Sequence, residues 1–500
     1  MGRQLTVAQV EPRVPLERAR VVVAGLGVTG RAVVEALAGL EGRGAAGVVT
    51  VDAHADDADV RGPDAADPDV AARLLADAHL LVASPGWAPT TPLLAAALGA
   101  GVPVWSEIEL AWRLRARRPG DRPAPWLAVT GTNGKTTTVE MLGSILTAAG
   151  LRAVTAGNVG TPAVTAVLDP ELDVLALEVS SFQLHFTHTM SVRAGAVLNV
   201  AGDHLDWHGS LEAYAADKGR IYERAQVACV YNTADPRTEQ LVRDADVVEG
   251  ARAVGFTLGA PGPGQLGLIE AVLVDRAFHA PADAVDRLTY AAELGTLSDL
   301  AHLAPTPAGS GVTPVAPPHV VADALAAAAL ARAHGVPARA VRDGLRAFRP
   351  GAHRIERVGL LDDVAYVDDS KATNPHAAAA SLAGYAPGTV VWVAGGLAKG
   401  ARLDEVVAAR RDRLRAAVLI GVDAEPFADA LARHAPEIPV VVIDPDDTGS
   451  VMRRAVAAAR QLARPGDTVL LAPAGASMDQ FRSYAQRGEA FAAAVAELGH

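Results

Sequence analysis

Thr130-Gly131-Thr132-Asn133-Gly134-Lys135-Thr136-Thr137-Thr138 directly follows the apolar run Trp126–Val129. This order predicts a strand that turns at two glycines and continues as a helix. In such a turn, several backbone N–H groups and the positive end of the helix point toward one place, a geometry that binds phosphate. Lys135 can reach the outer phosphates of a nucleotide, and the Thr136 hydroxyl is placed to ligate magnesium. The spacing is not that of the usual P-loop, and an ordinary glycine turn before a helix is the alternative.

The composition of the chain is typical of a soluble enzyme. Its 500 residues correspond to about three domains of ordinary size. No apolar run reaches the ~20 residues of a membrane span, and residues 1–20 lack the apolar core of a secretory signal. The single cysteine, Cys229, rules out an internal disulfide and suits a reducing cytosol. The net charge of −12 argues against non-specific nucleic-acid binding. We therefore expect a cytoplasmic monomer that acts on small molecules, without nucleic-acid partners.

Strand-like and helix-like apolar patterns alternate through three successive blocks. The alternation predicts an α/β fold of three domains: a Rossmann-like domain over residues 1–120, a central P-loop-type ATPase domain over 121–349 and a C-terminal Rossmann-like domain over 350–500. The Pro- and Gly-rich stretch 259–318 interrupts the second block. Its part from 295 to 318 is interpreted as a loop or surface insertion. The expected strands are 20–24, 47–51, 80–83, 126–129, 173–177, 194–200, 364–367, 390–393, 417–420 and 468–471.

A second glycine pattern follows the first expected strand. Gly25, Gly27 and Gly30 form G-x-G-x-x-G, and Asp52 ends the next strand. Taken alone, this pattern is the fingerprint of a dinucleotide site. Nothing further along the chain resembles hydride chemistry. A different diphosphate-containing ligand, such as a UDP-sugar, is therefore favoured over NAD at the same backbone N–H groups.

Acidic and imidazole groups follow two strands of the second block. Glu178 closes one strand, and Asp203-His204-Leu205-Asp206 follows the next, while Lys218 lies in a helix-like run further on. Such groups near a phosphate loop would neutralise phosphate charge through magnesium. Each residue alone is more often structural, Glu178 and Lys218 as solvated charges and His204 as a packed histidine. Their joint placement favours a metal site.

Together these motifs resemble the Mur ligase family. The phosphate loop is similar to that of Mur ligases and folylpolyglutamate synthetases, and Leu177–Leu184 and Leu198–Asp206 are similar to Mur ligase signatures. In the third block, Asp368–Asn374 and Leu471–Phe481, followed by Gln486-Arg487-Gly488, resemble the branch of the family that adds D-glutamate.

The resemblance spans residues 18–498 and implies an ATP-dependent amide ligase of cytoplasmic peptidoglycan synthesis. ATP would phosphorylate the L-alanyl carboxylate of UDP-N-acetylmuramoyl-L-alanine, and the amine of D-glutamate would then attack the acyl phosphate and expel phosphate. As the resemblance implies, Thr136 and Glu178 would hold one magnesium ion, and His204 and a carbamylated Lys218 would hold a second. The implied catalytic residues are Lys135, His204, Lys218 and Lys371.

The resemblance also assigns binding contacts residue by residue. Those implied for ATP are Gly131, Thr132, Asn133, Gly134, Lys135, Thr136, Thr137, Asp323, Arg354 and Asp369. Those implied for the UDP-substrate are Val28, Thr29, Asp52, Gly86, Asn158 and His204. Those implied for D-glutamate are Thr373, Lys399, Ser477 and Tyr484. A cation with hydroxyl and amide donors is what a dicarboxylate needs. Read alone, Ser477 and Tyr484 would be interpreted as a helix cap and a core residue.

Two positions depart from the family pattern. Where the family usually has amide residues on the adenine side, this chain reads His319-Val320-Val321-Ala322-Asp323, and an ionised Asp323 cannot donate a hydrogen bond. His54 lies near Asp52 where an arginine is common. Three alternatives stay open: another Mur ligase, a folylpolyglutamate synthetase, or a regulator that binds UDP-sugar and ATP without catalysis.

Overall fold

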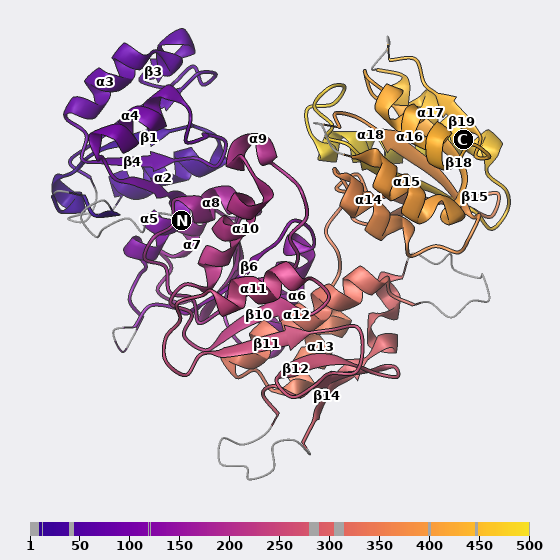
Figure 1. Cartoon of the computed structure of the whole chain (residues 1–500), viewed down its shortest axis with the longest axis horizontal. Coiled ribbons are helices and arrows are strands. Elements are labelled where there is room, and N and C mark those ends of the chain that lie inside the picture. The colour runs from indigo at the N-terminus through magenta and orange to yellow at the C-terminus, as the bar shows by residue number, and fades with distance from the viewer. Residues whose placement is uncertain are drawn as a thin grey trace. The chain divides into compact units, whose positions relative to one another are not determined.

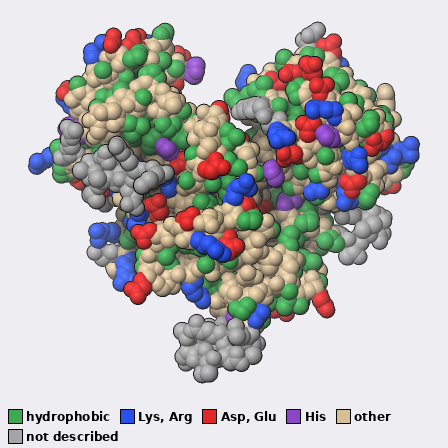
Figure 2. All heavy atoms as spheres, in the orientation of Figure 1, with side chains coloured by type: hydrophobic (Ala, Val, Ile, Leu, Met, Phe, Trp, Pro, Cys, Tyr) green, Lys and Arg blue, Asp and Glu red, His purple; other side chains and the backbone are tan. Residues whose placement is uncertain are grey.

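The computed structural model describes residues 10–12, 14–39, 45–118, 120, 122–279, 290–304, 315–398, 402–445 and 449–499. Within these ranges the chain forms three sheets flanked by helices, so the predicted α/β class is confirmed (Figure 1). No helix in the described ranges is both long and apolar enough to cross a membrane. On the face drawn in Figure 2, acidic and basic side chains are interspersed.

The described residues divide into two compact units. The first comprises residues 1–269, 273–294 and 323–345, and the second comprises 270–272, 295–322 and 346–500. Two of the three sheets lie mainly in the first unit. The domain bounds expected at 120 and 349 remain predictions.

The first sheet is parallel, with strand order β3-β2-β1-β4-β5. Its order reverses at β1, where a Rossmann-type sheet opens a crevice at the carboxyl ends of its strands. The strands are β1 Arg20–Ala24, β2 Gly47–Asp52, β3 Val60–Arg61, β4 Leu80–Ala83 and β5 Val104–Ser106. The helices are η1 Leu16–Arg18, α2 Val28–Gly39, η2 Gly62–Ala66, α3 Pro68–Ala76, α4 Pro92–Ala100 and α5 Glu107–Leu114.

The second sheet has the order β14-β13-β12-β11-β10-β9-β6-β8-β7, and β6 is parallel to both of its neighbours. Its β6 is buried along its whole length, as its apolar run predicts. The strands are β6 Trp126–Thr130, β7 Ala153–Gly157, β8 Val174–Glu178, β9 Ala194–Val197, β10 Ala228–Asn232, β11 Arg252–Phe256, β12 Gln265–Ile269, β13 Val272–Asp275 and β14 Ala292–Thr296. The helices are α6 Lys135–Ala148, α7 Ala163–Ala166, α8 Ser181–His185, α9 Leu205–His208, α10 Leu211–Gly219, η3 Arg220–Tyr222, α11 Pro236–Arg243, η5 Leu297–Leu303, α12 Pro318–His334 and α13 Ala338–Ala347.

The stretch expected to be a loop from 295 onward is partly regular. It begins with the end of β14 and continues as η5, while 305–314 lie outside the described residues. A capping box explains the helical turn, because Asp299 Oδ2 accepts from the Thr296 backbone N–H at 2.8 Å. The proline and glycine content of this stretch indicated a loop more strongly than the capping residues Thr296 and Asp299 indicated a helical turn.

The third sheet has the order β15-β16-β20-β17-β18-β19, and only the β15–β16 pair is antiparallel among its described pairs. Successive residues of its central strands pack into two different cores, one on each face. The strands are β15 Glu356–Leu361, β16 Val364–Asp368, β17 Val390–Gly395, β18 Leu414–Ile420, β19 Val440–Val442 and β20 Thr468–Ala474. The helices are α14 Pro375–Leu382, α15 Leu403–Arg410, η6 Arg411–Arg413, α16 Glu425–His434, α17 Val451–Leu462 and α18 Tyr484–Leu498.

Buried polar contacts join the first sheet to the second within the first unit. The Ser106 backbone N–H donates to the Phe186 carbonyl at 2.9 Å. Glu107 Oε1 accepts from the Val164 N–H at 2.7 Å, and Glu109 Oε2 accepts from the His188 N–H at 2.8 Å. One apolar core also contains residues from both sheets. These contacts fix the two sheets relative to each other.

Candidate active site

The phosphate-loop stretch adopts the predicted strand, turn and helix. Gly134 precedes α6 with φ of 83°, a backbone conformation that favours glycine, and a Cβ there would collide with Asp323 Oδ1. Lys135 Nζ donates to the carbonyls of Gly131 at 2.9 Å and Thr132 at 3.0 Å. The lysine therefore lies over the loop, where the outer phosphates of a nucleotide would bind.

Asn199, just beyond β9, braces this loop. Its backbone carbonyl accepts from the Thr132 N–H at 3.0 Å, and its Oδ1 accepts from the Asn133 N–H at 2.9 Å. Its Nδ2 donates to the Asn133 carbonyl at 3.1 Å. Three hydrogen bonds to two successive residues fix the turn before any ligand binds. Asn199 lies in the stretch Leu198–Asp206 singled out from the sequence, but its sequence neighbours do not indicate that it holds the phosphate loop.

Glu178 ends β8 directly beside the loop, because it pairs in register with Val129 of β6. Its side chain is buried, and Oε1 accepts from Asn158 Nδ2 at 2.9 Å. The other oxygen, Oε2, is buried and has no hydrogen-bond partner among the residues that the structure describes. A buried carboxylate oxygen in that state is costly unless a cation or donor satisfies it. Glu178 therefore fits a magnesium ligand.

Lys218 on α10 is 1% exposed, although helix lysines are ordinarily solvated. Its Nζ donates to the Gly131 carbonyl at 2.9 Å and lies 4.3 Å from the centre of the Tyr214 ring. Burial, followed by the positive charge of Lys135, holds the pKa of Lys218 well below its usual range. These surroundings favour the neutral amine, which is the nucleophilic form.

His204 precedes α9 with φ of 52°, and its side chain is 42% exposed. Its ring centre lies 4.8 Å from that of Phe182, and its Nε2 lies 3.6 Å from Asp203 Oδ2. Asp203 acts electrostatically on Lys218, so this loop borders the lysine's surroundings. The metal-ligand role of His204 remains a prediction.

Apart from His204, which follows β9, the residues implied for the UDP-substrate lie at or just beyond the carboxyl ends of β1, β2, β4 and β7. Asp52 Oδ2 accepts from the Leu26 N–H at 2.7 Å, and Oδ1 accepts from the His54 N–H at 2.8 Å. Burial opposes ionisation of Asp52, but these backbone hydrogen bonds outweigh it and lower its pKa. The carboxylate thus orders the glycine turn. Val28 is exposed at the start of α2, whereas the Asn158 amide faces Glu178.

In the second unit, several predicted residues surround the start of α18. Lys371 Nζ lies 4.0 Å from the centre of the Tyr484 ring, and the Thr373 N–H donates to the Lys371 carbonyl at 2.8 Å. Ser477 is buried after β20. Lys399 lies outside the described residues.

Arg354 and Asp369 of the same unit act on each other electrostatically. Burial raises the pKa of Asp369 to about 7, and the Arg354 charge works in the opposite direction. Nucleotide contact by this pair remains a prediction.

Comparisons with known proteins identify the family. Residues 129–260 match the family model described as Mur ligase middle domain, and 353–475 match that described as Mur ligase, glutamate ligase domain. The chain is 58% identical to the UDP-N-acetylmuramoylalanine–D-glutamate ligase of Streptomyces coelicolor, over 96% of this chain and 98% of that protein. The chain belongs to the Mur ligase family. A Mycolicibacterium smegmatis relative of the same name is 48% identical over 95% of this chain and 96% of its own length.

Solved Mur ligases share the fold of this chain. UDP-N-acetylmuramate-alanine ligase MurC from Thermotoga maritima superposes with a TM-score of 0.54 at 17% identity, covering 96% of this chain and all of that one. MurF ligase from the same organism, solved in complex with ADP, gives a TM-score of 0.52 at 17% identity and covers 99% of both chains. At these identities the likeness concerns the Mur ligase fold alone.

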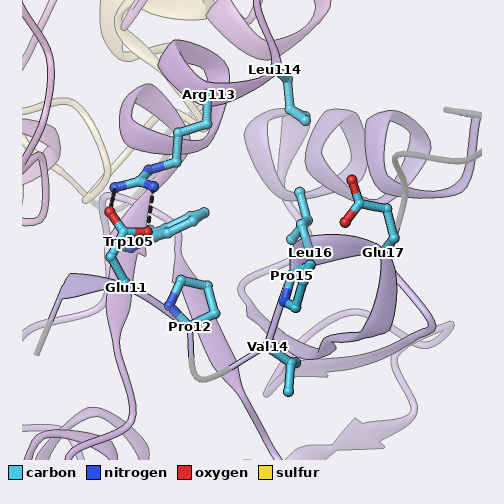
Figure 3. Close-up of a pocket in the computed structure, with 9 residues that line it drawn as sticks. All are labelled: Glu11, Pro12, Val14, Pro15, Leu16, Glu17, Trp105, Arg113 and Leu114. Atoms are coloured by element: carbon cyan, nitrogen blue, oxygen red, sulfur yellow. Dashed lines mark hydrogen bonds and ion pairs between the residues drawn. The ribbon is translucent and has the colours of Figure 1, made fainter. Parts of the chain in front are cut away.

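One cavity lies apart from the residues predicted for this Mur ligase. It has a volume of about 360 Å³ and is lined by Glu11, Pro12 and residues 14–17 together with Trp105, Arg113 and Leu114 (Figure 3). Arg113 closes one side of it, because its guanidinium donates to both carboxylate oxygens of Glu11 at 2.7 and 2.9 Å. The Arg113 guanidinium and the Glu11 carboxylate that line this cavity are therefore already paired with each other.

Proposed function

We propose that this chain is an ATP-dependent ligase that joins D-glutamate to UDP-N-acetylmuramoyl-L-alanine in peptidoglycan synthesis. One observation carries the proposal: the amino groups of Lys135 and Lys218 converge on the Gly131 carbonyl, with Glu178 close enough to act on Lys218. Lys135 would supply positive charge at the outer phosphates, while buried Glu178 and Lys218 would hold the magnesium that phosphoryl transfer to a carboxylate needs.

The reaction proceeds in two steps. The L-alanyl carboxylate oxygen attacks the γ-phosphorus of ATP, forming an acyl phosphate and releasing ADP. The D-glutamate amine then attacks the acyl carbon and loses a proton, and the tetrahedral intermediate collapses to the amide and phosphate. Lys135 binds the outer phosphates from the loop, and the Asn199 brace keeps the loop N–H groups in place for them.

The second part of the proposal is a carbamate on Lys218. A neutral amine attacks the carbon of CO2 and loses a proton, which converts a group that repels cations into an anionic oxygen ligand. The enclosed position and the lowered pKa of Lys218 support this chemistry. Thr136, Glu178, His204 and carbamylated Lys218 would hold magnesium ions. Bound magnesium supplies charge neutralisation at the transferring phosphoryl group.

The lysine content of the chain supports these assignments. The chain contains four lysines, Lys135, Lys218, Lys371 and Lys399, and many arginines. Arginine supplies a permanent surface charge, but it can neither lose its proton in a protein nor form a carbamate. All four lysines therefore stand at positions to which the family resemblance assigns a role in the site.

We propose D-glutamate as the amino acid because Thr373, Lys399, Ser477 and Tyr484 match the D-glutamate-adding branch. The lysine would pair with a carboxylate, and the Thr and Ser hydroxyls would donate to the second one. The UDP moiety would lie at the carboxyl ends of β1, β2 and β4, near Val28, Thr29, Asp52 and Gly86. We also propose that the protein acts in the cytoplasm as a monomer, with domains bounded near residues 120 and 349.

The deciding experiment measures ADP release with each substrate omitted in turn. We expect turnover only when UDP-N-acetylmuramoyl-L-alanine and D-glutamate are both present. A regulator without catalysis would bind ATP and the UDP-sugar but release no ADP. Turnover with a folate substrate, or with a different UDP-muramoyl acceptor, would assign the chain to another branch.

A further inference from the structure

One carboxylate connects the three segments that carry the proposed metal ligands Glu178, His204 and Lys218. Asp217 lies on α10, is 7% exposed, and accepts hydrogen bonds from two histidines. His185 Nδ1, on α8, lies 2.9 Å from Asp217 Oδ2, and His208 Nδ1, on α9, lies 2.9 Å from the same oxygen.

The helices α8 and α9 are short and begin soon after a proposed ligand, and α10 contains one. Glu178 ends β8 three positions before α8 begins, His204 precedes α9 directly, and Lys218 adjoins Asp217 on α10. Helices of four or five residues have little intrinsic stability, so their positions depend on tertiary contacts. The Asp217 hydrogen bonds are therefore contacts through which the three segments hold one another.

The network extends beyond Asp217. His208 has a fully buried side chain, and its Nε2 lies 3.0 Å from Ser181 Oγ on α8. Because ionised Asp217 only accepts, a neutral His208 donates from Nδ1 and accepts the Ser181 hydroxyl at Nε2. His208 also stacks on Phe182 with a centroid distance of 5.4 Å and an interplanar angle of 7°. On the other side, Arg220 Nε lies 3.5 Å from Asp217 Oδ1.

The charge of Asp217 does not itself favour carbamate formation on Lys218. A carboxylate beside the amine raises the pKa of Lys218 and so opposes its neutral form. Neighbouring residues on a helix also point about 100° apart, so Asp217 faces the histidines while Lys218 faces the phosphate loop. Asp217 therefore acts on the Lys218 site by positioning the helices around it, not through its charge.

We propose that Asp217, through its hydrogen bonds to His185 and His208, is a positioning residue that holds α8, α9 and α10 in the arrangement required for the Lys218 carbamate and for metal binding. This inference rests on the proposed function. Outer residues that orient metal ligands typically change metal affinity by roughly 10–100-fold when they are mutated.

The test follows the carbamate directly by NMR of protein equilibrated with ¹³C-bicarbonate, together with Mn²⁺ binding measured by electron paramagnetic resonance in the presence of ADP. We expect Asp217→Asn to lose most of the carbamate signal and to bind Mn²⁺ about tenfold more weakly. Glu212→Gln removes an exposed charge from the same helix, so it serves as the matched control and should match the wild type.

A second pair of variants distinguishes the loss of a hydrogen bond to Asp217 from a general folding defect. His208→Ala removes the hydrogen bond to Asp217, whereas His208→Asn retains a donor near the Nδ1 position. We expect the carbamate signal to be weaker in the alanine variant than in the asparagine variant, with binding of a fluorescent ADP analogue unchanged in both. Equal signals in the wild type, Asp217→Asn and both His208 variants would overturn the inference. Absence of the signal from the wild type would instead refute the carbamate, and unchanged Mn²⁺ affinity in Asp217→Asn would then refute the positioning role.

Discussion

Lys135 and Lys218 donate to the same acceptor, the backbone carbonyl of Gly131, each at 2.9 Å. Burial, followed by the positive charge of Lys135, lowers the pKa of Lys218. We expect the two amines to have different tasks, Lys135 in binding phosphate and Lys218 as the proposed nucleophile toward CO2.

We expect Lys135→Ala to reduce turnover by at least ~10³-fold, because phosphoryl transfer depends on charge placed at the outer phosphates. The melting temperature should stay close to that of the wild type, since a partly exposed lysine at the phosphate loop contributes little to stability. ADP release and a thermal melt measure both quantities. Near-normal turnover would remove the loop lysine from the mechanism.

Lys218→Ala should lose several orders of magnitude in rate and regain part of it with a short-chain carboxylate. A small acid can occupy the vacated volume and supply the missing oxygen ligand. Lys218→Arg should show no recovery, because its guanidinium stays positive and fills the site. Ordinary activity in Lys218→Ala would show that the carbamate is not needed.

The amino-acid pocket should select D-glutamate over L-glutamate, L-lysine and meso-diaminopimelate. The expectation rests on the match of Thr373, Lys399 and Ser477 to the D-glutamate-adding branch, and their hydroxyls and amine suit a dicarboxylate. Competition assays with equimolar amino acids and mass analysis of the product give the ratio directly. Preferred incorporation of any of the three competitors would place the chain in another branch of the family.

Glu107→Gln should make stability less dependent on pH without altering the site residues. Burial raises the pKa of Glu107 to about 7 from 4.5, so the native state binds the proton more tightly than the unfolded state does. The wild type should therefore lose stability as pH rises from about 4.5 to 7. Glutamine keeps an acceptor for the Val164 N–H and carries no charge. Its melting temperature should fall less between pH 5 and pH 8, and parallel curves for both proteins would contradict this account.

The sequence predicted the fold well because its strands are buried apolar runs, which a local pattern reveals. The run before Thr130 and the strands ending at Glu178 and Asp368 lie where they were expected. The parallel first sheet also followed from the alternation of strands and helices, but its strand order did not.

The site was only partly predictable because its supporting contacts join distant residues. Asn199 lies 66 positions from Asn133, and His185 lies 32 from Asp217, so no spacing rule connects them. Asp52 is predicted to contact the UDP-substrate, and its described bonds also order the glycine turn, a task that the sequence motif does not distinguish from ligand binding. The substrate role of Asp52 and the roles of the other site residues remain predictions.

The buried bonds of Ser106, Glu107 and Glu109 give the two sheets of the first unit a fixed mutual placement. If the UDP-substrate and ATP bind at the strand ends of these two sheets, the distance between the reacting carboxylate and the γ-phosphate is set by a rigid template. The acyl phosphate could then form before the amino acid arrives. An enzyme built this way would scramble oxygen-18 between the bridging and non-bridging positions of ATP when D-glutamate is withheld.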